Sequence, residues 1–148
     1  MKAYLELSDS LDDREQVDEI LILAYLGDEL LMLRKNRETT LPRARFEREE
    51  AIEKTVRRAL YEQTGAFLRK SKLLGLLRIE EDQSEKELPV YVGIVNHIES
   101  PVLHDAGRKR LCNSHEARRQ LADPEWEKTK DFMFYHAWKM KERLARSH

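Results

Sequence analysis

The distribution of apolar residues predicts an early β-hairpin. Residues 18–26 (DEILILAYL) and 29–35 (ELLMLRK) are two apolar runs separated by Gly27-Asp28, a pattern typical of two strands joined by a tight turn. The first run is apolar at odd and even positions alike, which predicts a strand buried on both faces. Residues 1–16 are less regular and contain one short apolar stretch that is compatible with a further strand.

A helix is predicted over residues 49–64, after a polar loop at 36–40. Gly65 follows the last helical residue, in the position of a left-handed C-cap. Acidic residues gather at the expected start, where the helix dipole favours them. These acidic residues are Glu47, Glu49, Glu50 and Glu53. The apolar residues at helical spacing are Ile52, Val56, Ala59 and Leu60, so we expect Ala59 to pack in the core.

The second half of the chain alternates apolar and charged segments. Residues 73–79 and 88–98 are predicted strands, and the charged segment 80–87 between them predicts a surface loop. A further short strand is compatible with residues 107–112. This order of elements predicts an α/β fold with a mixed sheet and helices on both faces.

Two helices are predicted at the C-terminal end. Ser114 is placed to cap a short helix over 115–121, and Asp123-Pro124 supplies an N-cap and a first-turn proline for a final helix that ends near Arg146. The expected inner residues of that helix are Trp126, Met133, Ala137, Met140 and Leu144, with Phe134 and Trp138 beside them. Aromatic residues, Phe132 among them, face more than one side of this helix, so one apolar edge is a candidate homodimer surface.

Composition sets the class of protein that we expect. The 148 residues are 41% hydrophobic and 37% charged, with a net charge of -1, which predicts a single globular domain over 1–148. Interspersed charges give no strong nucleic-acid signal. The only cysteine, Cys112, excludes an internal disulfide. The acidic N-terminal segment predicts neither a secretory signal nor a membrane span, so we expect a cytoplasmic protein.

Residues 44–66 resemble the Nudix box. In words, that box is Gly, five residues, Glu, seven residues, Arg-Glu-aliphatic-any-Glu-Glu-any-Gly-aliphatic. The matching residues are Glu50, Arg58, Leu60, Glu62 and Gly65. The departures from the box are Ala44, Ala59, Gln63 and Ala66. We expect residues 42–45 (PRAR) to form a loop before the helix, where the family usually has Pro-Gly-Gly. This resemblance to the MutT-like Nudix hydrolases implies an α/β/α sandwich with a mixed β-sheet and a long C-terminal helix.

The resemblance also implies which residues would do the chemistry. Nudix enzymes cut pyrophosphate linkages with Mg²⁺ or Mn²⁺, which the clustered glutamates of the box hold. Of the three clustered glutamates only Glu62 is present, as the candidate catalytic residue and metal ligand, since Ala59 and Gln63 bring no carboxylate. Glu50 and Arg58 are expected to form a pair that orients the box.

Two functional hypotheses follow, and they differ in whether hydrolysis survives. In the first, Arg43 and Arg45 bind a phosphorylated small molecule without metal, because arginine recognises phosphate in bidentate fashion, and hydrolysis is impaired or lost. In the second, Mg²⁺- or Mn²⁺-dependent pyrophosphohydrolysis continues with replacement ligands. The candidate replacements are Glu47, Glu49, Glu53, Glu80, Glu81 and Asp82. An accidental match in an unrelated α/β module is the third interpretation.

Overall fold

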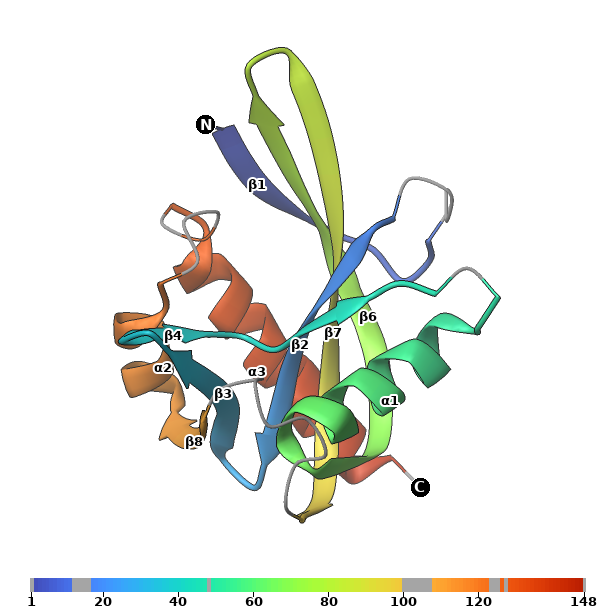
Figure 1. Cartoon of the computed structure of the whole chain (residues 1–148), viewed down its shortest axis with the longest axis vertical. Coiled ribbons are helices and arrows are strands. Elements are labelled where there is room, and N and C mark those ends of the chain that lie inside the picture. The colour runs from blue at the N-terminus through green and yellow to red at the C-terminus, as the bar shows by residue number, and fades with distance from the viewer. Residues whose placement is uncertain are drawn as a thin grey trace.

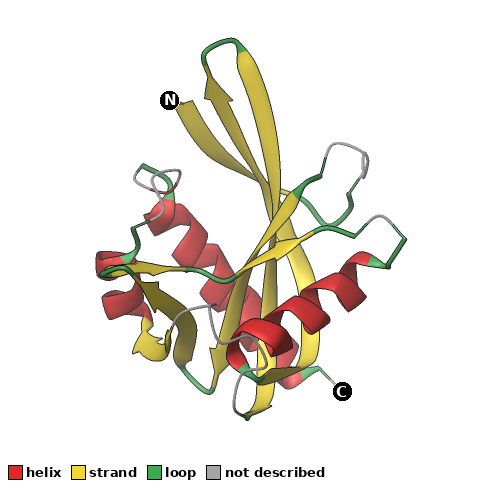
Figure 2. Cartoon of the chain, in the orientation of Figure 1, coloured by secondary structure: helices red, strands yellow, loops and turns green. Residues whose placement is uncertain are grey.

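The structure, a computed structural model, describes residues 2–11, 17–47, 49–99, 108–122, 126 and 128–147. Strands make up about half of these described residues, and three helices lie around them (Figures 1 and 2). The strands are β1 (Lys2–Leu7), β2 (Glu19–Leu26), β3 (Glu29–Lys35), β4 (Glu38–Thr40), β5 (Arg43–Arg45), β6 (Ala66–Glu81), β7 (Ser84–Ile98) and β8 (Arg108–Asn113). The helices are α1 (Ile52–Thr64), α2 (Ser114–Gln120) and α3 (Lys130–Arg146).

One mixed sheet joins these strands. Its order is β1-β6-β7-β2-β3-β4, with β5 paired to β2 and β8 paired to β3. Strands β2 and β7 run parallel, in a register that places Leu21 opposite Val90 and Tyr25 opposite Ile94. The other pairings are antiparallel. The mixed sheet predicted from the order of elements is therefore confirmed.

Strand β2 separates two apolar cores. Successive side chains of a strand point to opposite faces, and both faces of β2 are buried. Leu21, Leu23 and Tyr25 pack in the core beneath α2 and α3, which includes Ala117, Met133 and Ala137. The core beneath α1 contains the alternate residues of β2 with the apolar side of the helix. Its members from these two elements are Ile20, Ile22, Ala24, Ile52, Val56, Ala59 and Leu60.

The three helices thus complete an α/β/α sandwich. Helix α1 covers one face of the sheet and α3 crosses the other, with α2 beside it (Figure 1). This confirms the predicted fold class, including its long C-terminal helix. Among the described residues, no helix combines the length and apolar character that crossing a membrane requires.

The predicted β2–β3 hairpin is confirmed, but the loop predicted over 36–40 is wrong. Gly27 has a φ of 61° at the hairpin turn, a value that suits glycine. Residues 38–40 form β4, which pairs with β3 through Leu33–Thr40 and Lys35–Glu38. Thr39 is buried at this edge of the sheet. The sequence did not predict this strand because its side chains are polar and show no apolar pattern. The strand is stabilised by backbone pairing with β3.

The loop predicted over 80–87 is also wrong. Strands β6 and β7 continue through this segment to a two-residue turn, so the predicted strands 73–79 and 88–98 are the inner parts of a long hairpin. The turn residues Asp82 and Gln83 have φ values of 46° and 68°. Positive φ at both central residues is the mark of a type I′ hairpin turn, and in Figure 1 this tip projects above the rest of the molecule.

The C-terminal helices begin at other residues than expected. Asn113, rather than Ser114, caps α2, and its side-chain oxygen accepts the backbone N–H of Glu116 at 2.8 Å. Helix α3 begins at Lys130, and the predicted Asp123-Pro124 start lies outside the described residues.

Some of the aromatic residues on and near α3 are buried and so cannot belong to the candidate homodimer surface. Trp126 and Phe134 are buried in the core, whereas Phe132 and Tyr135 are 45% and 56% exposed. A homodimer surface on this helix stays a prediction, now confined to its exposed aromatic residues.

Candidate functional site

The box helix begins later than its acidic residues suggest. Ala51 is its N-cap residue, with extended backbone angles and no side-chain cap, and the first helical residue is Ile52. Of the four glutamates expected at the start, only Glu53 lies in the first turn. Glu50 lies just before the helix, and its carboxylate accepts hydrogen bonds from side chains further along α1.

The end of the helix is as predicted. Gly65 has a φ of 78° and its N–H donates to Tyr61 O at 2.7 Å, which is the left-handed C-cap. Lys109 of β8 donates from Nζ to Thr64 O at 3.1 Å and to Glu99 O at 2.7 Å. A cation at this end also complements the helix dipole. The C-terminal end of the box helix is therefore held by a residue of β8.

The segment before the helix is a strand, where the sequence predicted a loop. Arg43–Arg45 forms β5 and pairs with β2, so that Ala44 lies opposite Ile20. Ala44 is fully buried in the core beneath α1. Without the glycines of the Nudix loop, this segment adopts an extended backbone and buries its one small apolar side chain. Arg43 and Arg45 flank Ala44 and lie together on the other side of the strand.

Three of the predicted site residues are in contact. Arg58 Nη2 donates to Glu50 Oε1 at 2.9 Å, and Arg58 Nε lies 3.3 Å from Glu50 Oε2, so this pair is bidentate. Arg58 Nη1 lies 3.3 Å from Glu62 Oε2. One guanidinium is therefore shared between two carboxylates. Thr55, which the sequence did not single out, donates from Oγ1 to Glu50 Oε1 at 3.1 Å.

These contacts change the acidity of Glu50. The hydrogen bond from Arg58 is the main cause that lowers the pKa of the Glu50 carboxyl below its ordinary value of 4.5, and the bond from Thr55 acts in the same direction. The Glu50 side chain is 18% exposed and that of Arg58 is 36% exposed. The resemblance implied this pair, and its role in orienting the turn before α1 stays a prediction.

Replacing Arg58 by methionine should make stability less dependent on pH under acidic conditions. Because the pKa of Glu50 is lowered by folding, the pair stabilises the protein above about pH 4.5 and this stabilisation is lost as the pH falls through the folded-state value. The destabilisation caused by Arg58→Met should therefore be larger at neutral pH than in acid. Urea unfolding of both proteins across this range measures the difference.

Arg57→Met is the matched control for this experiment. Arg57 is the exposed neighbour of Arg58 on the same helix, so its replacement removes the same charge without removing the bond to Glu50. We expect its effect on stability to be small at every pH. Equal pH dependence in the two variants would contradict the assigned role of Arg58.

The two departures at the centre of the box occupy different environments. Ala59 is 4% exposed and packs in the core beneath α1, as predicted. Gln63 is half-buried, and its Nε2 donates to the backbone carbonyl of Arg43 at 2.6 Å. This bond connects α1 to β5 across twenty residues of sequence. Sequence reasoning missed it because the partner is a backbone atom whose position depends on the pairing of β5.

An open depression of about 770 Å³ lies beside the start of α1. Its lining combines two guanidinium groups, three carboxylates and one aromatic ring. The lining residues are Arg45, Phe46, Glu47, Glu49, Glu50 and Arg58. Arg45 thus lies on the same depression as the Glu50–Arg58 pair. The lining does not include Arg43, whose backbone carbonyl accepts the hydrogen bond from Gln63.

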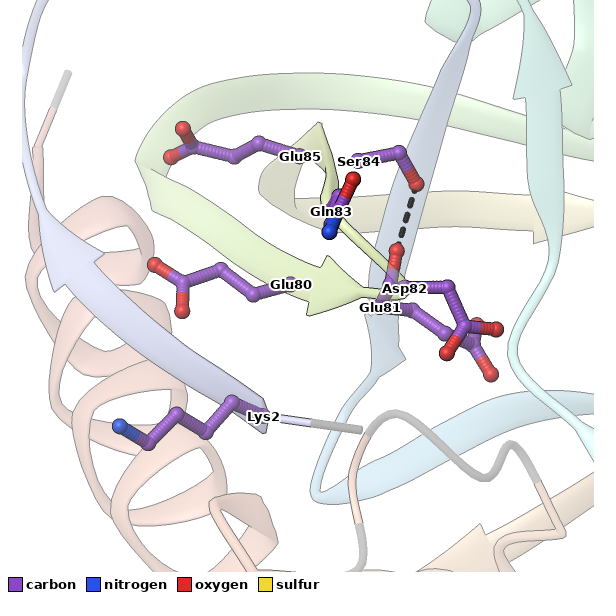
Figure 3. Close-up of a pocket in the computed structure, with 7 residues that line it drawn as sticks. All are labelled: Lys2, Glu80, Glu81, Asp82, Gln83, Ser84 and Glu85. Atoms are coloured by element: carbon purple, nitrogen blue, oxygen red, sulfur yellow. Dashed lines mark hydrogen bonds between the residues drawn. The ribbon is translucent and has the colours of Figure 1, made fainter.

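Three of the predicted replacement ligands are remote from the box helix. Glu80, Glu81 and Asp82 lie at the tip of the β6–β7 hairpin, near Lys2 of β1, whereas α1 packs at the opposite end of the sheet (Figure 1). In Figure 3 the carboxylates of Glu80 and Glu85 extend to one side and those of Glu81 and Asp82 to the other. These acidic groups therefore neither approach the box nor converge on one point.

The donor set does not fit the metal that the Nudix resemblance implies. Mg²⁺ and Mn²⁺ prefer several oxygen ligands, usually carboxylates. Within the described part of the chain, no group of three or more His, Cys, Asp or Glu side chains is placed to hold an ion. Glu62 is paired with Arg58, and Ala59 offers no oxygen.

With this geometry in view, the fold can be identified: it is the fold of the Nudix hydrolases, including MutT-like proteins. A structure of the pyrophosphohydrolase RppH of Bacillus subtilis is similar to this one, with a TM-score of 0.73 and 16% sequence identity. The match covers 94% of this chain and 90% of that chain. A Nudix hydrolase from Nitrosomonas europaea gives a TM-score of 0.65 at 18% identity, covering 84% of this chain and 90% of that one.

A third similar structure is an Ap4A hydrolase of C. elegans, with a TM-score of 0.60 and 15% identity over 86% of this chain and 96% of that one. No protein-family model matches the sequence, and no curated protein matches it either. At these identities the likeness is one of fold.

Proposed function

We propose that this Nudix-fold domain binds a nucleoside-diphosphate-linked or other phosphorylated small molecule, and that its Mg²⁺-dependent pyrophosphate hydrolysis is impaired or lost. The observation that carries the proposal is the contact of Arg58 with both Glu50 and Glu62. Glu62, the remaining carboxylate of the three that hold metal in the box, is already paired with the guanidinium of Arg58.

The binding half of the proposal rests on Arg43 and Arg45. They lie on the same side of β5, and Arg45 borders the depression beside α1. Their guanidinium groups suit the oxygens of a phosphate group. Because these charges belong to the protein, binding through them requires no divalent cation.

The double variant Arg43→Ala/Arg45→Ala should lose most of its affinity for ADP-ribose, used here as the probe. Loss of two charge-assisted contacts weakens binding by at least about a hundredfold, since each contributes on the order of 1.5–3 kcal/mol. Titration calorimetry measures the affinity for each protein, with and without EDTA. We expect EDTA to leave the wild-type affinity unchanged.

The charge-matched control is Arg69→Ala/Arg119→Ala. Both of these arginines are exposed and lie outside β5 and α1, so their loss lowers the net charge equally without touching the proposed site. Equal binding by the Arg43/Arg45 variant and this control would refute phosphate binding at β5. Wild-type affinity that disappears in EDTA would refute the metal-independent part.

The second candidate function is a working pyrophosphohydrolase with metal ligands from outside the box. Glu47 and Glu49 favour it, because they line the same depression as Glu50. Phosphate release from dinucleotides, nucleotide sugars and nucleoside triphosphates in excess Mg²⁺ or Mn²⁺ distinguishes the two functions. Turnover that vanishes in Glu62→Gln would establish this second function, whereas absence of turnover supports the binding domain.

A further inference from the structure

Two acceptor oxygens beside the box helix are already matched by donors of the protein. The carbonyl of Arg43 receives Gln63 Nε2 at 2.6 Å, and Glu62 Oε2 lies 3.3 Å from Arg58 Nη1. Because a carbonyl oxygen can only accept, the amide nitrogen of Gln63 must be the atom that faces it. Carbonyl and carboxylate oxygens are also the ligands that Mg²⁺ and Mn²⁺ prefer.

We propose that Gln63 and Arg58 take the place of a divalent cation in this helix–strand contact, so that the contact between α1 and β5 forms without metal. A single change, Gln63→Glu, then turns the contact into a cation site. The Gln63 amide joins α1 to the carbonyl of β5, which is a connection that a bound cation can make. The guanidinium of Arg58 supplies positive charge to Glu62. This inference concerns the protein without any phosphorylated ligand and does not rest on the proposed function.

A glutamate at position 63 reverses the chemistry of the contact. Gln63 and glutamate have almost the same shape, so the side chain still reaches the Arg43 carbonyl. Two acceptor oxygens then face each other without a donor, which is destabilising at a half-buried position. The new carboxylate and the Arg43 carbonyl are oxygen ligands of the kind that a hard divalent cation prefers, with water completing its coordination.

Thermal unfolding of three proteins tests the proposal. The wild type, Gln63→Glu and Gln63→Ala are each measured in EDTA and in millimolar Mn²⁺ or Mg²⁺. The wild-type Tm should be the same in both conditions. Both variants should unfold at least about 3 °C lower in EDTA, since each loses roughly one net hydrogen bond. Only Gln63→Glu should recover, with a Tm that rises with the logarithm of the cation concentration.

Direct binding of Mn²⁺ provides a second measurement that does not depend on stability. The electron paramagnetic resonance signal of free Mn²⁺ should decrease when Gln63→Glu is added and should be unchanged by the wild type or by Gln63→Ala. Sodium chloride at matched ionic strength shows whether the recovery of Tm is general screening. Recovery with sodium chloride alone would overturn the assignment of a cation site.

Two further results would overturn the proposal. Mn²⁺ binding by the wild type, seen as a rising Tm and a decreasing free signal, would show that the natural chain holds the cation itself. A Gln63→Glu protein with the wild-type Tm in EDTA would show that the amide does not support the contact. If Gln63→Glu does not fold, the wild type and Gln63→Ala decide the outcome. Failure of ADP-ribose binding would leave all of these results unaffected.

Discussion

Ala59→Glu, which restores a glutamate of the Nudix box, should destabilise the protein by about 3–5 kcal/mol at neutral pH, the usual cost of an uncompensated buried charge. Ala59 is 4% exposed, and its neighbours in the core beneath α1 include Val56, Leu60 and Phe46. A carboxylate placed among these side chains loses its hydration, and its added volume also strains the packing. The family residue is therefore expected to disrupt this fold.

The pH dependence of the destabilisation distinguishes the cost of the buried charge from the cost of the added side-chain volume. Burial raises the pKa of a carboxyl group, so the charge-specific part of the cost is absent below the ordinary glutamate pKa of about 4.5 and grows as the pH rises above it. Ala59→Gln has nearly the same volume without the charge. The difference in unfolding free energy between Ala59→Glu and Ala59→Gln, measured in urea, should increase with pH.

The opposite outcome would be equally informative. An Ala59→Glu protein as stable as Ala59→Gln at neutral pH would mean that the new carboxylate reaches solvent or a cation. The face of α1 around position 59 would then be open to water. Such a result would favour the pyrophosphohydrolase that recruits metal ligands from outside the box.

Gly75→Ala should destabilise the protein by about 3 kcal/mol, at the upper end of typical overpacking effects. A Cβ atom at position 75 would lie 2.2 Å from the carbonyl oxygen of Glu6 and 2.9 Å from Leu7 Cα. Both are backbone atoms of β1, so no side-chain rotation relieves the contact. Strand β1 would have to move away from β6, with which it pairs from Lys2–Glu80 to Leu7–Gly75.

Urea unfolding measures this cost, and hydrogen exchange locates it. The amides of β1 that pair with β6 should exchange faster in Gly75→Ala than in the wild type. Gly27→Ala is the matched control, because a Cβ there meets no atom within 4 Å and only its φ of 61° is unfavourable. We expect about 1 kcal/mol for that change. A cost at Gly75 no larger than at Gly27 would contradict the close approach of β1.

Features that depend on neighbouring residues were predictable from the sequence. The apolar run 18–26 and the turn at Gly27-Asp28 predicted the β2–β3 hairpin, because periodicity and turn chemistry are local. The C-cap at Gly65 and the burial of Ala59 followed from helical spacing in the same way. The resemblance of residues 44–66 to the Nudix box then indicated the fold that the structural comparison shows.

Features that depend on distant partners were not predictable. The polar residues of β4 and the tip of the β6–β7 hairpin carry no apolar pattern, and their backbones are satisfied by strands elsewhere in the sheet. The segment Arg43–Arg45 was expected to be a loop, yet it pairs with β2. In each case the partner strand supplies the hydrogen bonds that define the element.

The same division applies to the candidate site. The sequence, through its resemblance to the Nudix box, predicted the pairing of Glu50 with Arg58. The contact of Arg58 with Glu62 was not predicted, although the two residues are one helical turn apart. Only the tertiary structure decided that Gln63 bonds to the Arg43 carbonyl and that the acidic tip at Glu80–Asp82 lies far from the box. Helical spacing is fixed by the backbone of one segment, whereas these contacts depend on how the sheet arranges strands that are distant in sequence.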